Sequence, residues 1–326
     1  MPERPERSSR PELLVLLGPT AVGKTNLSLA IAERFHCEII SGDSMQVYRR
    51  MDIGTAKATE AERKRVPHHM IDILEPDDPF SVADFQERVR ALITDIHARG
   101  KLPFIVGGTG LYIESVCYDF QFSEGGSDEA FRERMNAFAD AHGEEALHDL
   151  LKETDPASAA RIHSNDRRRT IRALEIRHIT GIPMSEHLAR QTKVSPYETC
   201  LIGLTMDRDL LYNRIERRID AMMDAGLVAE VRGLLADGYG RGLISMQGLG
   251  YKEIAAYLEG ECSLEEAVAL LKRDTRRFAK RQLSWFRRMK EIHWVELEEG
   301  SNFSEQLHGI NDIITGKFRF LREYNS

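Results

Sequence analysis

The sequence predicts a three-layer α/β fold with a parallel sheet and an inserted all-helical domain. Short apolar runs alternate with amphipathic helical segments in the first and last thirds of the chain, and the first apolar run leads into a glycine-rich loop. Strands that alternate with helices imply a parallel sheet covered on both faces. In residues 120–196, charged helical patterns follow one another without a strand-like run. We therefore expect a discontinuous core domain over residues 13–119 and 197–316, a helical insertion over residues 120–196, and a disordered tail over residues 1–12.

The first part of the core contains repeated strand–loop–helix units. Apolar runs predict buried strands at residues 13–17, 38–41 and 102–106, and the spacing of apolar residues predicts helices at 24–34 and 84–100. Each strand is followed by a loop that contains glycine. Ligands of parallel sheets bind at the carboxyl ends of the strands. We therefore expect the loops after these three strands to share one crevice.

Capping residues mark helices in the rest of the chain. Sheet-like sequence resumes at residues 200–204, after which Asp207 can cap a helix that continues to Ala225. Ser263 and the glutamate three residues later fit a capping box, which predicts a helix that continues to about Lys290. The helical patterns of the insertion cover residues 128–141, 144–153 and 166–180.

The composition excludes several classes of protein. The chain has 326 residues, 42% hydrophobic and 30% charged, with ordinary glycine and proline content, so it is neither disordered nor collagen-like. Its longest apolar run, residues 13–17, is far shorter than the roughly 20 residues of a membrane helix, and the charged N-terminus has no apolar signal region. We therefore expect a cytoplasmic protein without a membrane partner. The four cysteines lie far apart, which favours buried thiols over disulfides or a metal clip.

The formal net charge of −7 ordinarily disfavours a nucleic-acid partner, but it averages two unlike parts of the chain. Residues 272–290 contain nine Lys/Arg against one Asp, a net +8, which leaves about −15 for the remainder. A second basic cluster, at residues 167–172, opens one of the helices of the insertion. A charged run is usually a solvated helix face. Cations at this density with so few anions suit a phosphate backbone better, so we expect a nucleic acid to bind here.

The loop after the first strand matches the phosphate-loop pattern GxxxxGK[ST]. In this motif, backbone N–H groups and the helix N-terminus surround phosphate oxygens, the lysine supplies a mobile cation, and the hydroxyl binds magnesium. The loop lies directly after a predicted strand and directly before a predicted helix, as the motif requires. The sequence therefore predicts a bound di- or triphosphate, with Mg²⁺ on the last residue of the loop. The loop residues are Gly18, Pro19, Thr20, Ala21, Val22, Gly23, Lys24 and Thr25.

One part of an ordinary phosphate-loop ATPase or kinase is missing. Those enzymes hold magnesium with an aspartate at the end of a second apolar strand, whereas the strand predicted at 102–106 ends in Gly107-Gly108-Thr109. Asp72 is a weak substitute, because only two apolar residues precede it. The pattern therefore disfavours simple ATP hydrolysis.

Several further blocks accompany the phosphate loop. They are SGDSMQVY at 41–48, MDIGTAK at 51–57, PHH at 67–69, VGGTGLY at 106–112, RTIRALE at 169–175, RIERR at 214–218, GLGYK at 248–252 and KRQLSWFR at 280–287. Together with GPTAVGKT at 18–25, they closely resemble the bacterial tRNA dimethylallyltransferases over about residues 13–290. The resemblance implies a P-loop NTPase-like core that transfers a dimethylallyl group from dimethylallyl diphosphate to the exocyclic amine of the adenine on the 3′ side of the tRNA anticodon. The Cys/His spacing of the zinc finger found in some eukaryotic relatives is lacking, which indicates the bacterial type.

The resemblance also implies roles for individual residues. Asp43 is implied to be the general base that takes a proton from the adenine amine, a poor nucleophile. Arg218 is implied to clamp the diphosphate, while Thr25 holds the magnesium that stabilises the leaving pyrophosphate. The target adenine must leave its stack in the anticodon loop to react. The residues implied to contact tRNA are Asp43, Ser44, Met45, Gln46, Thr109, Arg132, Arg168, Arg169, Thr170, Ile171, Arg172, Gly250, Tyr251, Lys252, Lys280, Arg281, Gln282, Trp285 and Arg287.

For several residues the pattern leaves a structural alternative open. Asp43 belongs to a residue type that caps turns, Arg214 fits a solvated helix face, and Tyr251 fits a buried position as well as a base-stacking one. The adjacent histidines His68 and His69 favour structural hydrogen bonding over metal binding.

Two other functions also fit parts of the sequence. An adenylate prenyltransferase would use the same donor on a free nucleotide, and a phosphate-loop kinase would combine the loop with an RNA-binding appendage. The helical insertion and the two basic clusters favour tRNA, because a free nucleotide needs neither. We expect the protein to act as a monomer.

Overall fold

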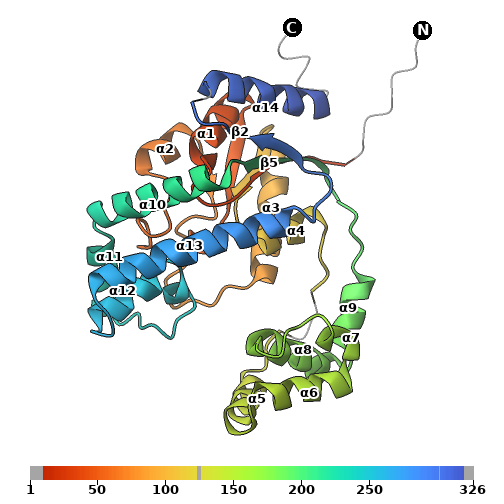
Figure 1. Ribbon diagram of the computed structural model, residues 1–326. Helices are drawn as coiled ribbons and strands as arrows, with labels where there is room; N and C mark the ends of the chain where they lie inside the picture. Colours follow the sequence, from red (N-terminus) through yellow and green to blue (C-terminus); the bar gives the residue numbers. More distant parts are fainter. Residues whose placement is uncertain (1–9, 123–125, 301, 319–326) are drawn as a thin grey trace, which may run out of the picture. The chain divides into compact units, whose positions relative to one another are not determined.

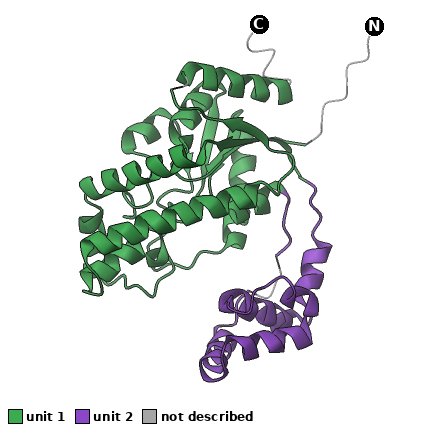
Figure 2. Ribbon diagram, viewed as in Figure 1, with its two compact units in different colours: residues 1–117, 195–326 green, residues 118–194 purple. Residues whose placement is uncertain are grey.

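The computed structural model describes residues 10–122, 126–300 and 302–318, and the chain divides into two compact units (Figure 2). Unit 1 comprises residues 1–117 and 195–326, and unit 2 comprises residues 118–194. Both crossings between the units lie two residues before the positions expected from the sequence, 120 and 196.

Unit 1 is built on a parallel sheet with the strand order β3-β2-β4-β1-β5-β6. Every adjacent pair of strands among the described residues is parallel. The side chains of residues 13–17 in β1 are fully buried, because a central parallel strand is covered on both faces and its sequence is therefore apolar without alternation. The strands are β1 (Glu12–Leu17), β2 (Cys37–Gly42), β3 (His68–His69), β4 (Leu102–Gly107), β5 (Glu198–Thr205) and β6 (His293–Glu296).

Helices cover the sheet of unit 1 (Figure 1). Right-handed crossovers place α1 and α14, which pack together, on one face, and α3, α4 and α13 on the other. The predicted three-layer α/β fold is therefore confirmed. The helices are α1 (Lys24–Arg34), α2 (Glu60–Arg65), α3 (Val82–Ala98), α4 (Gly110–Cys117), α10 (Arg208–Asp224), α11 (Leu227–Ala236), the 3₁₀ helix η1 (Ser245–Gln247), α12 (Tyr251–Leu258), α13 (Leu264–Phe286) and α14 (Phe303–Lys317).

The start of the chain corrects one expectation. Glu12, which was expected to belong to the disordered tail, is the first residue of β1, because it pairs with Glu198 of β5. Arg10 also contacts the core, since its Nη1 donates a hydrogen bond to the carbonyl oxygen of Ser195 at 3.0 Å. Residues 1–9 of the expected tail lie outside the described residues.

Two helix boundaries also differ from the prediction. α3 begins before the expected Asp84, because the hydroxyl of Ser81 accepts a hydrogen bond from the Asp84 N–H and completes a capping box. α13 ends at Phe286 rather than near Lys290. The sequence pattern predicted none of the following elements: α2, α4, α7 (Pro156–Ala159), α9 (Met184–Arg190), α11, η1, α12, α14, β3 and β6. β3 has two residues and α2 has six, too few to show a period.

Unit 2 contains only helices as regular elements in the described part of its chain. Asp128 and Asp166 cap two of them, each through a carboxylate that accepts a backbone N–H three residues on. The unit has its own apolar core, which includes Phe131, Leu147 and Leu151. No helix among the described residues of either unit is long and apolar enough to cross a membrane. The helices are α5 (Glu129–His142), α6 (Glu144–Thr154), α7 (Pro156–Ala159), α8 (Arg167–Thr180) and α9 (Met184–Arg190).

Candidate active site

The loops that follow β1, β2 and β4 lie side by side. The strand ends are in register, with Gly107 opposite both Leu17 and Gly42. The Thr109 N–H donates a hydrogen bond to the Gly42 carbonyl at 3.2 Å. A Cβ on Gly107 would lie 2.4 Å from that carbonyl oxygen, so only glycine permits this close approach. The three loops therefore meet at the carboxyl edge of the sheet, where the sequence places them.

The phosphate loop leads from β1 into α1 and ends in a left-handed glycine. Gly23 is the N-cap of α1 with φ of +110°, a conformation that glycine adopts without strain. Because glycine has no side chain to cap the helix, the first N–H groups of α1 receive no side-chain hydrogen bond. Such a helix N-terminus attracts anions through its N–H groups and its dipole.

Lys24 is partly buried beside charged neighbours. Its Nζ donates hydrogen bonds to the carbonyl oxygens of Gly18 at 2.9 Å and Pro19 at 2.8 Å. Burial, followed by the positive charge of Arg218, lowers the pKa of Lys24 to about 7, and the negative charge of Asp43 opposes this shift. The charges of Arg218 and Asp43 therefore both act on the lysine of the phosphate loop.

Two arginines of α10 face this site. Burial lowers the pKa of Arg218, and Asp43 opposes the shift, which places Arg218 near the carboxylate. The Nη2 atom of Arg214, one turn earlier, is 3.2 Å from the point that a Cβ on Gly23 would occupy. Arg214 and its neighbour Arg217 are both exposed, but the guanidinium of Arg214 reaches the last glycine of the phosphate loop. Arg214 therefore lies on a solvated helix face, as the structural alternative expects, and also contacts the loop.

Asp43 has the turn-capping role that the sequence left open. Its Oδ1 accepts a hydrogen bond from the Met45 N–H at 2.8 Å. Its Oδ2 makes no hydrogen bond among the described residues. The cap does not exclude a catalytic role, because it uses one carboxylate oxygen and leaves the other for a substrate proton.

The residues after Asp43 are held by contacts from distant segments. The Thr109 hydroxyl accepts a hydrogen bond from the Ser44 N–H at 3.1 Å. The Gln46 amide accepts from the Ser41 hydroxyl at 2.8 Å and donates to the Thr55 carbonyl at 3.2 Å. The sulfur of Met45 lies 3.4 Å from the Cβ position of Gly248. The neighbouring blocks 41–48 and 51–57 therefore meet the block 248–252, which is about 200 residues away in the sequence.

Tyr251 is a core residue. Its side chain is 1% exposed, and its hydroxyl donates a hydrogen bond to Glu230 at 2.6 Å. A Cβ on Gly54 would lie 2.5 Å from its ring, so the ring packs directly on the loop 51–57. Burial, followed by the charge of Glu230, raises the pKa of Tyr251. The predicted tRNA contact of Tyr251 is therefore wrong for this structure, because no face of its ring is open to a base.

Glu230 of α11 is a site residue that sequence reasoning missed. Its carboxylate accepts hydrogen bonds from the N–H groups of Asp52, Ile53 and Gly54 at 2.8–3.1 Å, in addition to the Tyr251 hydroxyl. One side chain thus fixes three consecutive amides of the loop 51–57. No sequence motif surrounds Glu230. Its role in holding the loop 51–57 is therefore visible only from its hydrogen bonds in the folded structure.

Asp72 and the two adjacent histidines form hydrogen bonds with other protein groups. Asp72, the weak substitute for a magnesium ligand, accepts hydrogen bonds from Lys57 and Arg63 at 2.6 Å each. Burial opposes the shift, but these hydrogen bonds lower the pKa of Asp72. His68 Nδ1 contacts the Val66 carbonyl, and His69 Nε2 contacts Glu38. The described residues contain no group of three or more His, Cys, Asp or Glu side chains arranged to hold a metal.

The basic segment 272–290, which covers the end of α13 and the residues just after it, divides into a paired and an unpaired part. Lys272 pairs with Asp220 of α10, Arg276 pairs with Glu216, and Arg273 and Arg277 both pair with Asp274. The later cations are exposed and form no ion pair among the described residues; they are Lys280, Arg281, Arg287, Arg288 and Lys290.

Two predicted tRNA contacts on α13 are directed inward instead. Gln282 is 6% exposed, and both ends of its amide are hydrogen-bonded within unit 1, so its predicted RNA contact is wrong for this structure. Trp285 is partly buried, and its Nε1 donates a hydrogen bond to Glu114 at 2.9 Å. Arg288 stacks on the Trp285 ring, 4.4 Å from its centroid.

Gly250 and Lys252 lie at the start of α12. Gly250 has φ of +93°, and its N–H donates a hydrogen bond to Glu253. Lys252 is partly exposed and lies 3.4 Å from Glu253.

In unit 2, a buried carboxylate holds two of the predicted RNA-binding arginines. Glu175 is fully buried and pairs with Arg132 at 2.8 Å and Arg172 at 2.6 Å. Thr170 and Ile171 are buried at 0% and 5% exposure, so their predicted side-chain contacts with RNA are wrong for this structure.

Unlike Arg132 and Arg172, the first arginines of α8 do not pair with Glu175. Arg168 and Arg169 are exposed, and Arg169 lies 3.5 Å from Asp166. Arg167, for which the sequence predicted no contact, pairs with Asp140 and Glu144.

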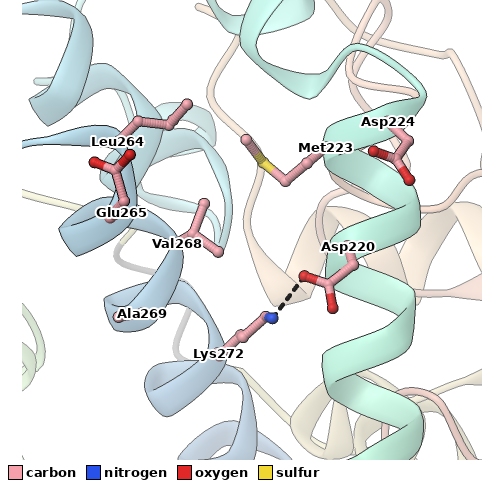
Figure 3. A pocket seen from close by; sticks show the side chains of 8 residues that line it. All are labelled: Asp220, Met223, Asp224, Leu264, Glu265, Val268, Ala269 and Lys272. Atoms are coloured by element: carbon pink, nitrogen blue, oxygen red, sulfur yellow. Dashed lines mark ion pairs between the residues drawn. The ribbon is translucent and has the colours of Figure 1, made fainter.

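A cavity of about 510 Å³ lies between α10 and α13 (Figure 3). The Lys272–Asp220 ion pair joins the two helices across it at 2.5 Å. None of the predicted site residues lines this cavity, so it is separate from the site at the phosphate loop. The lining residues are Asp220, Met223, Asp224, Leu264, Glu265, Val268, Ala269 and Lys272.

A phosphate loop, an aspartate and two arginines at the carboxyl edge of a parallel sheet define a phosphate-loop protein equipped to bind a diphosphate. Comparison with known families specifies the class. The IPP transferase family matches residues 46–289, and the isopentenyl transferase family matches residues 11–75. The chain belongs to the IPP transferase family. Its close relatives are tRNA dimethylallyltransferases.

The relatives match along nearly the whole chain. The tRNA dimethylallyltransferase of Bacillus licheniformis is 56% identical over 309 residues, 95% of this chain and 98% of that protein. The crystal structure of a full-length tRNA isopentenylpyrophosphate transferase from Bacillus halodurans is 48% identical, with a TM-score of 0.72 over 96% of this chain and 99% of that one. A eukaryotic dimethylallyltransferase acting on tRNA is 28% identical, with a TM-score of 0.80 over 94% of this chain and 80% of that one. The resemblance stated from the sequence is therefore confirmed.

Proposed function

We propose that this chain transfers a dimethylallyl group from dimethylallyl diphosphate to the exocyclic amine of the adenine on the 3′ side of the tRNA anticodon. The amine nitrogen forms a bond to the first carbon of the dimethylallyl group as the bond from that carbon to the diphosphate oxygen breaks. The amine loses one proton, and pyrophosphate leaves. The observation that carries the proposal is the grouping of Asp43 with Lys24 and Arg218 at the phosphate loop.

The donor side of the site has the charges that this reaction needs. The open N-terminus of α1, Lys24, Arg214 and Arg218 surround the phosphate loop and would stabilise the negative charge that grows on the leaving diphosphate. Thr25 fits a magnesium ligand, because it is exposed and its hydroxyl forms no hydrogen bond among the described residues. Bound Mg²⁺ would neutralise part of the charge of the diphosphate.

The acceptor side would use the second oxygen of Asp43. A carboxylate within reach of the exocyclic amine takes the proton that the nitrogen loses as the new bond forms. The loops that carry Ser44, Met45, Gln46 and Thr109 border Asp43 and would receive the extruded base.

The RNA would be held by cations of both units. The unpaired cations of α13 in unit 1, with Arg168, Arg169 and the pair Arg132 and Arg172 in unit 2, would meet phosphates of the anticodon stem-loop. Lys252 is partly exposed at the start of α12 and would join them. We propose that the enzyme acts as a monomer in the cytoplasm, where its tRNA substrate is found.

One labelling experiment tests this function against the alternatives. The protein is incubated with radiolabelled dimethylallyl diphosphate, Mg²⁺ and unmodified tRNA, and in a parallel reaction with AMP in place of tRNA. We expect label in the tRNA and none in AMP. Label in AMP would establish the adenylate prenyltransferase, which the shorter family match to residues 11–75 makes the relevant competitor. Transfer of γ-phosphate from labelled ATP, with no prenyl transfer, would establish a kinase.

A further inference from the structure

Gln282 connects the basic helix α13 to the diphosphate site. Its Oε1 accepts a hydrogen bond from the Thr20 N–H in the phosphate loop at 2.9 Å. Its Nε2 donates a hydrogen bond to the Gly108 carbonyl, in the loop after β4, also at 2.9 Å. These partners are 262 and 174 residues away in the sequence. A single amide therefore joins two of the three loops that form the crevice.

The surroundings of Gln282 leave its amide little room to move. A Cβ on Gly108 would lie 2.2 Å from the Gln282 Nε2 and 3.3 Å from the Gly18 carbonyl oxygen. Trp285, three residues later on the same helix, lies against Gly110, where a Cβ would be 2.4 Å from its ring. Two side chains on one face of α13 thus rest on the glycines of the β4 loop, and this contact orients the Gln282 amide.

The exposed positions of the same turns carry unpaired charge. Lys280 lies nearly opposite Gln282 on the helix, and Arg281 lies between these two faces. Both are exposed and form no ion pair among the described residues, and neither does Arg287, about two turns after Lys280. Residues on opposite faces of one helix serve different surfaces. The outward face suits phosphates of RNA, whereas Gln282 is directed at the donor site.

We propose that Gln282 is a positioning residue for the diphosphate site rather than a residue that contacts RNA. This proposal rests on the function proposed above, and it gives Gln282 a role in binding dimethylallyl diphosphate. Its acceptor oxygen holds the Thr20 amide, and its donor nitrogen holds the Gly108 carbonyl. Together they fix the distance between the phosphate loop and the loop that carries Thr109. Loss of the amide would let the two loops separate and would weaken the cradle around the diphosphate.

The test compares two neighbouring variants with opposite expectations. Gln282→Met keeps the size of the side chain and removes both hydrogen bonds, while Arg281→Met removes one exposed charge. Binding of inorganic pyrophosphate with Mg²⁺ is measured by calorimetry, and binding of an anticodon stem-loop by fluorescence anisotropy. We expect Gln282→Met to weaken pyrophosphate binding about 10-fold, the effect of losing one or two neutral hydrogen bonds, and to leave stem-loop binding within about 2-fold. Arg281→Met should weaken stem-loop binding and leave pyrophosphate binding within about 2-fold.

A second variant keeps the test decisive if Gln282→Met folds poorly. Gln282→Glu retains an acceptor for the Thr20 N–H but sets an anion against the Gly108 carbonyl and the diphosphate, so pyrophosphate binding should fall further. In turnover assays both Gln282 variants should raise the KM for dimethylallyl diphosphate more than they raise the KM for tRNA. Equal losses of both affinities, or a loss of stem-loop binding alone, would overturn the proposal, as would unchanged pyrophosphate binding. If the wild-type protein failed to label tRNA, the proposed function would fail, yet the pyrophosphate titration would still test Gln282.

Discussion

The Nη2 atom of Arg214 lies 3.2 Å from the point that a Cβ on Gly23 would occupy, so the guanidinium covers the last glycine of the phosphate loop. This relationship places a second arginine of α10 beside Arg218 at the diphosphate site. It also makes Gly23 sensitive to the smallest substitution, for two independent reasons. The backbone is left-handed there, and a methyl group would press against the tip of a charged side chain, which would have to shift.

Gly23→Ala should therefore weaken pyrophosphate binding at least about 10-fold, because the strain of the left-handed residue and the displaced guanidinium both act at the site. Calorimetry with Mg²⁺ and pyrophosphate measures the effect. Gly100→Ala is the matched control, because Gly100 has φ of +69° with nothing within 4 Å of its Cβ position. It should lose about 1 kcal/mol of stability and no pyrophosphate affinity. Equal behaviour of the two variants would show that Arg214 does not contribute.

Asp43→Asn separates the two roles of this residue. Asparagine retains an oxygen that can accept the Met45 N–H, so the turn is preserved, but it cannot take a proton from the substrate amine. We expect kcat to fall roughly 100-fold or more while the Kd for tRNA stays within about 2-fold. Asp43→Ala should lose the cap as well and be less stable in urea. If Asp43→Asn had a kcat near that of the wild type, Asp43 would have only the structural role of capping the turn.

The titration of Lys24 predicts a proton uptake on binding. Burial and Arg218 lower the pKa of Lys24 to about 7, so the amine is mostly neutral at pH 8. A bound diphosphate favours the charged form and raises this pKa. Pyrophosphate affinity should therefore decrease as pH rises above 7, and binding at pH 8 should take up as much as about one proton from the buffer. Calorimetry in buffers of different ionisation enthalpy measures the uptake. Lys24→Met, matched in length, should abolish it, and uptake that persists in this variant would assign the proton to another group.

The same pKa affects stability. A lysine whose pKa is lower in the folded protein binds fewer protons there than in the unfolded chain between about pH 7 and its ordinary value near 10.4. The contribution of Lys24 to the free energy of unfolding therefore rises with pH across this range. Lys24→Met should flatten this part of the pH profile in urea unfolding.

The division of α13 into paired and unpaired cations predicts which charges bind RNA. Lys280→Gln and Arg287→Gln together should lower the slope of log K for tRNA against log salt by about 1 to 2, since each phosphate contact contributes about 0.7 to 0.9. Arg276→Gln is the control, because Arg276 already pairs with Glu216 at 2.6 Å and should change the slope much less. A larger effect from Arg276 than from the unpaired cations would place the RNA on the other part of the helix.

Glu230→Gln tests the loop that α11 supports. The glutamine amide offers one acceptor oxygen where the carboxylate serves three N–H groups and a hydroxyl. We expect a loss of roughly 1 to 3 kcal/mol in urea unfolding and faster hydrogen exchange at Asp52, Ile53 and Gly54. Tyr251→Phe removes only one of these hydrogen bonds and should lose about 1 kcal/mol. Unchanged exchange at the three amides would mean that the loop is held by other contacts.

Local patterns predicted the elements that depend on local interactions. The helix at 24–34 and the phosphate loop before it were predicted with their observed boundaries, because the motif, the strand and the helix are consecutive in the chain. Elements too short to show a period were not predicted. Helices whose stability comes from tertiary packing were not predicted either, such as α12 with its buried Tyr251.

Residue roles were predicted less evenly. Asp43, Lys24 and Arg218 were expected together because motifs and family resemblance identified each of them, and the structure brings them into one electrostatic cluster. Glu230 had no motif, and its partners lie 176–178 residues earlier. Periodicity assigned α13 an inward and an outward face, but it could not say that Gln282 points inward to specific amides.

By itself the sequence determined the fold class, the position of the phosphate loop and the family, because each is written in short runs of neighbouring residues or in their order along the chain. Only the tertiary structure decided which cations of α13 have ion-pair partners, and which of the predicted RNA contacts are buried. The physical reason is that burial and pairing depend on side chains from elements far apart in sequence. Gln282 meets the Thr20 amide across 262 residues, and no local pattern encodes that distance.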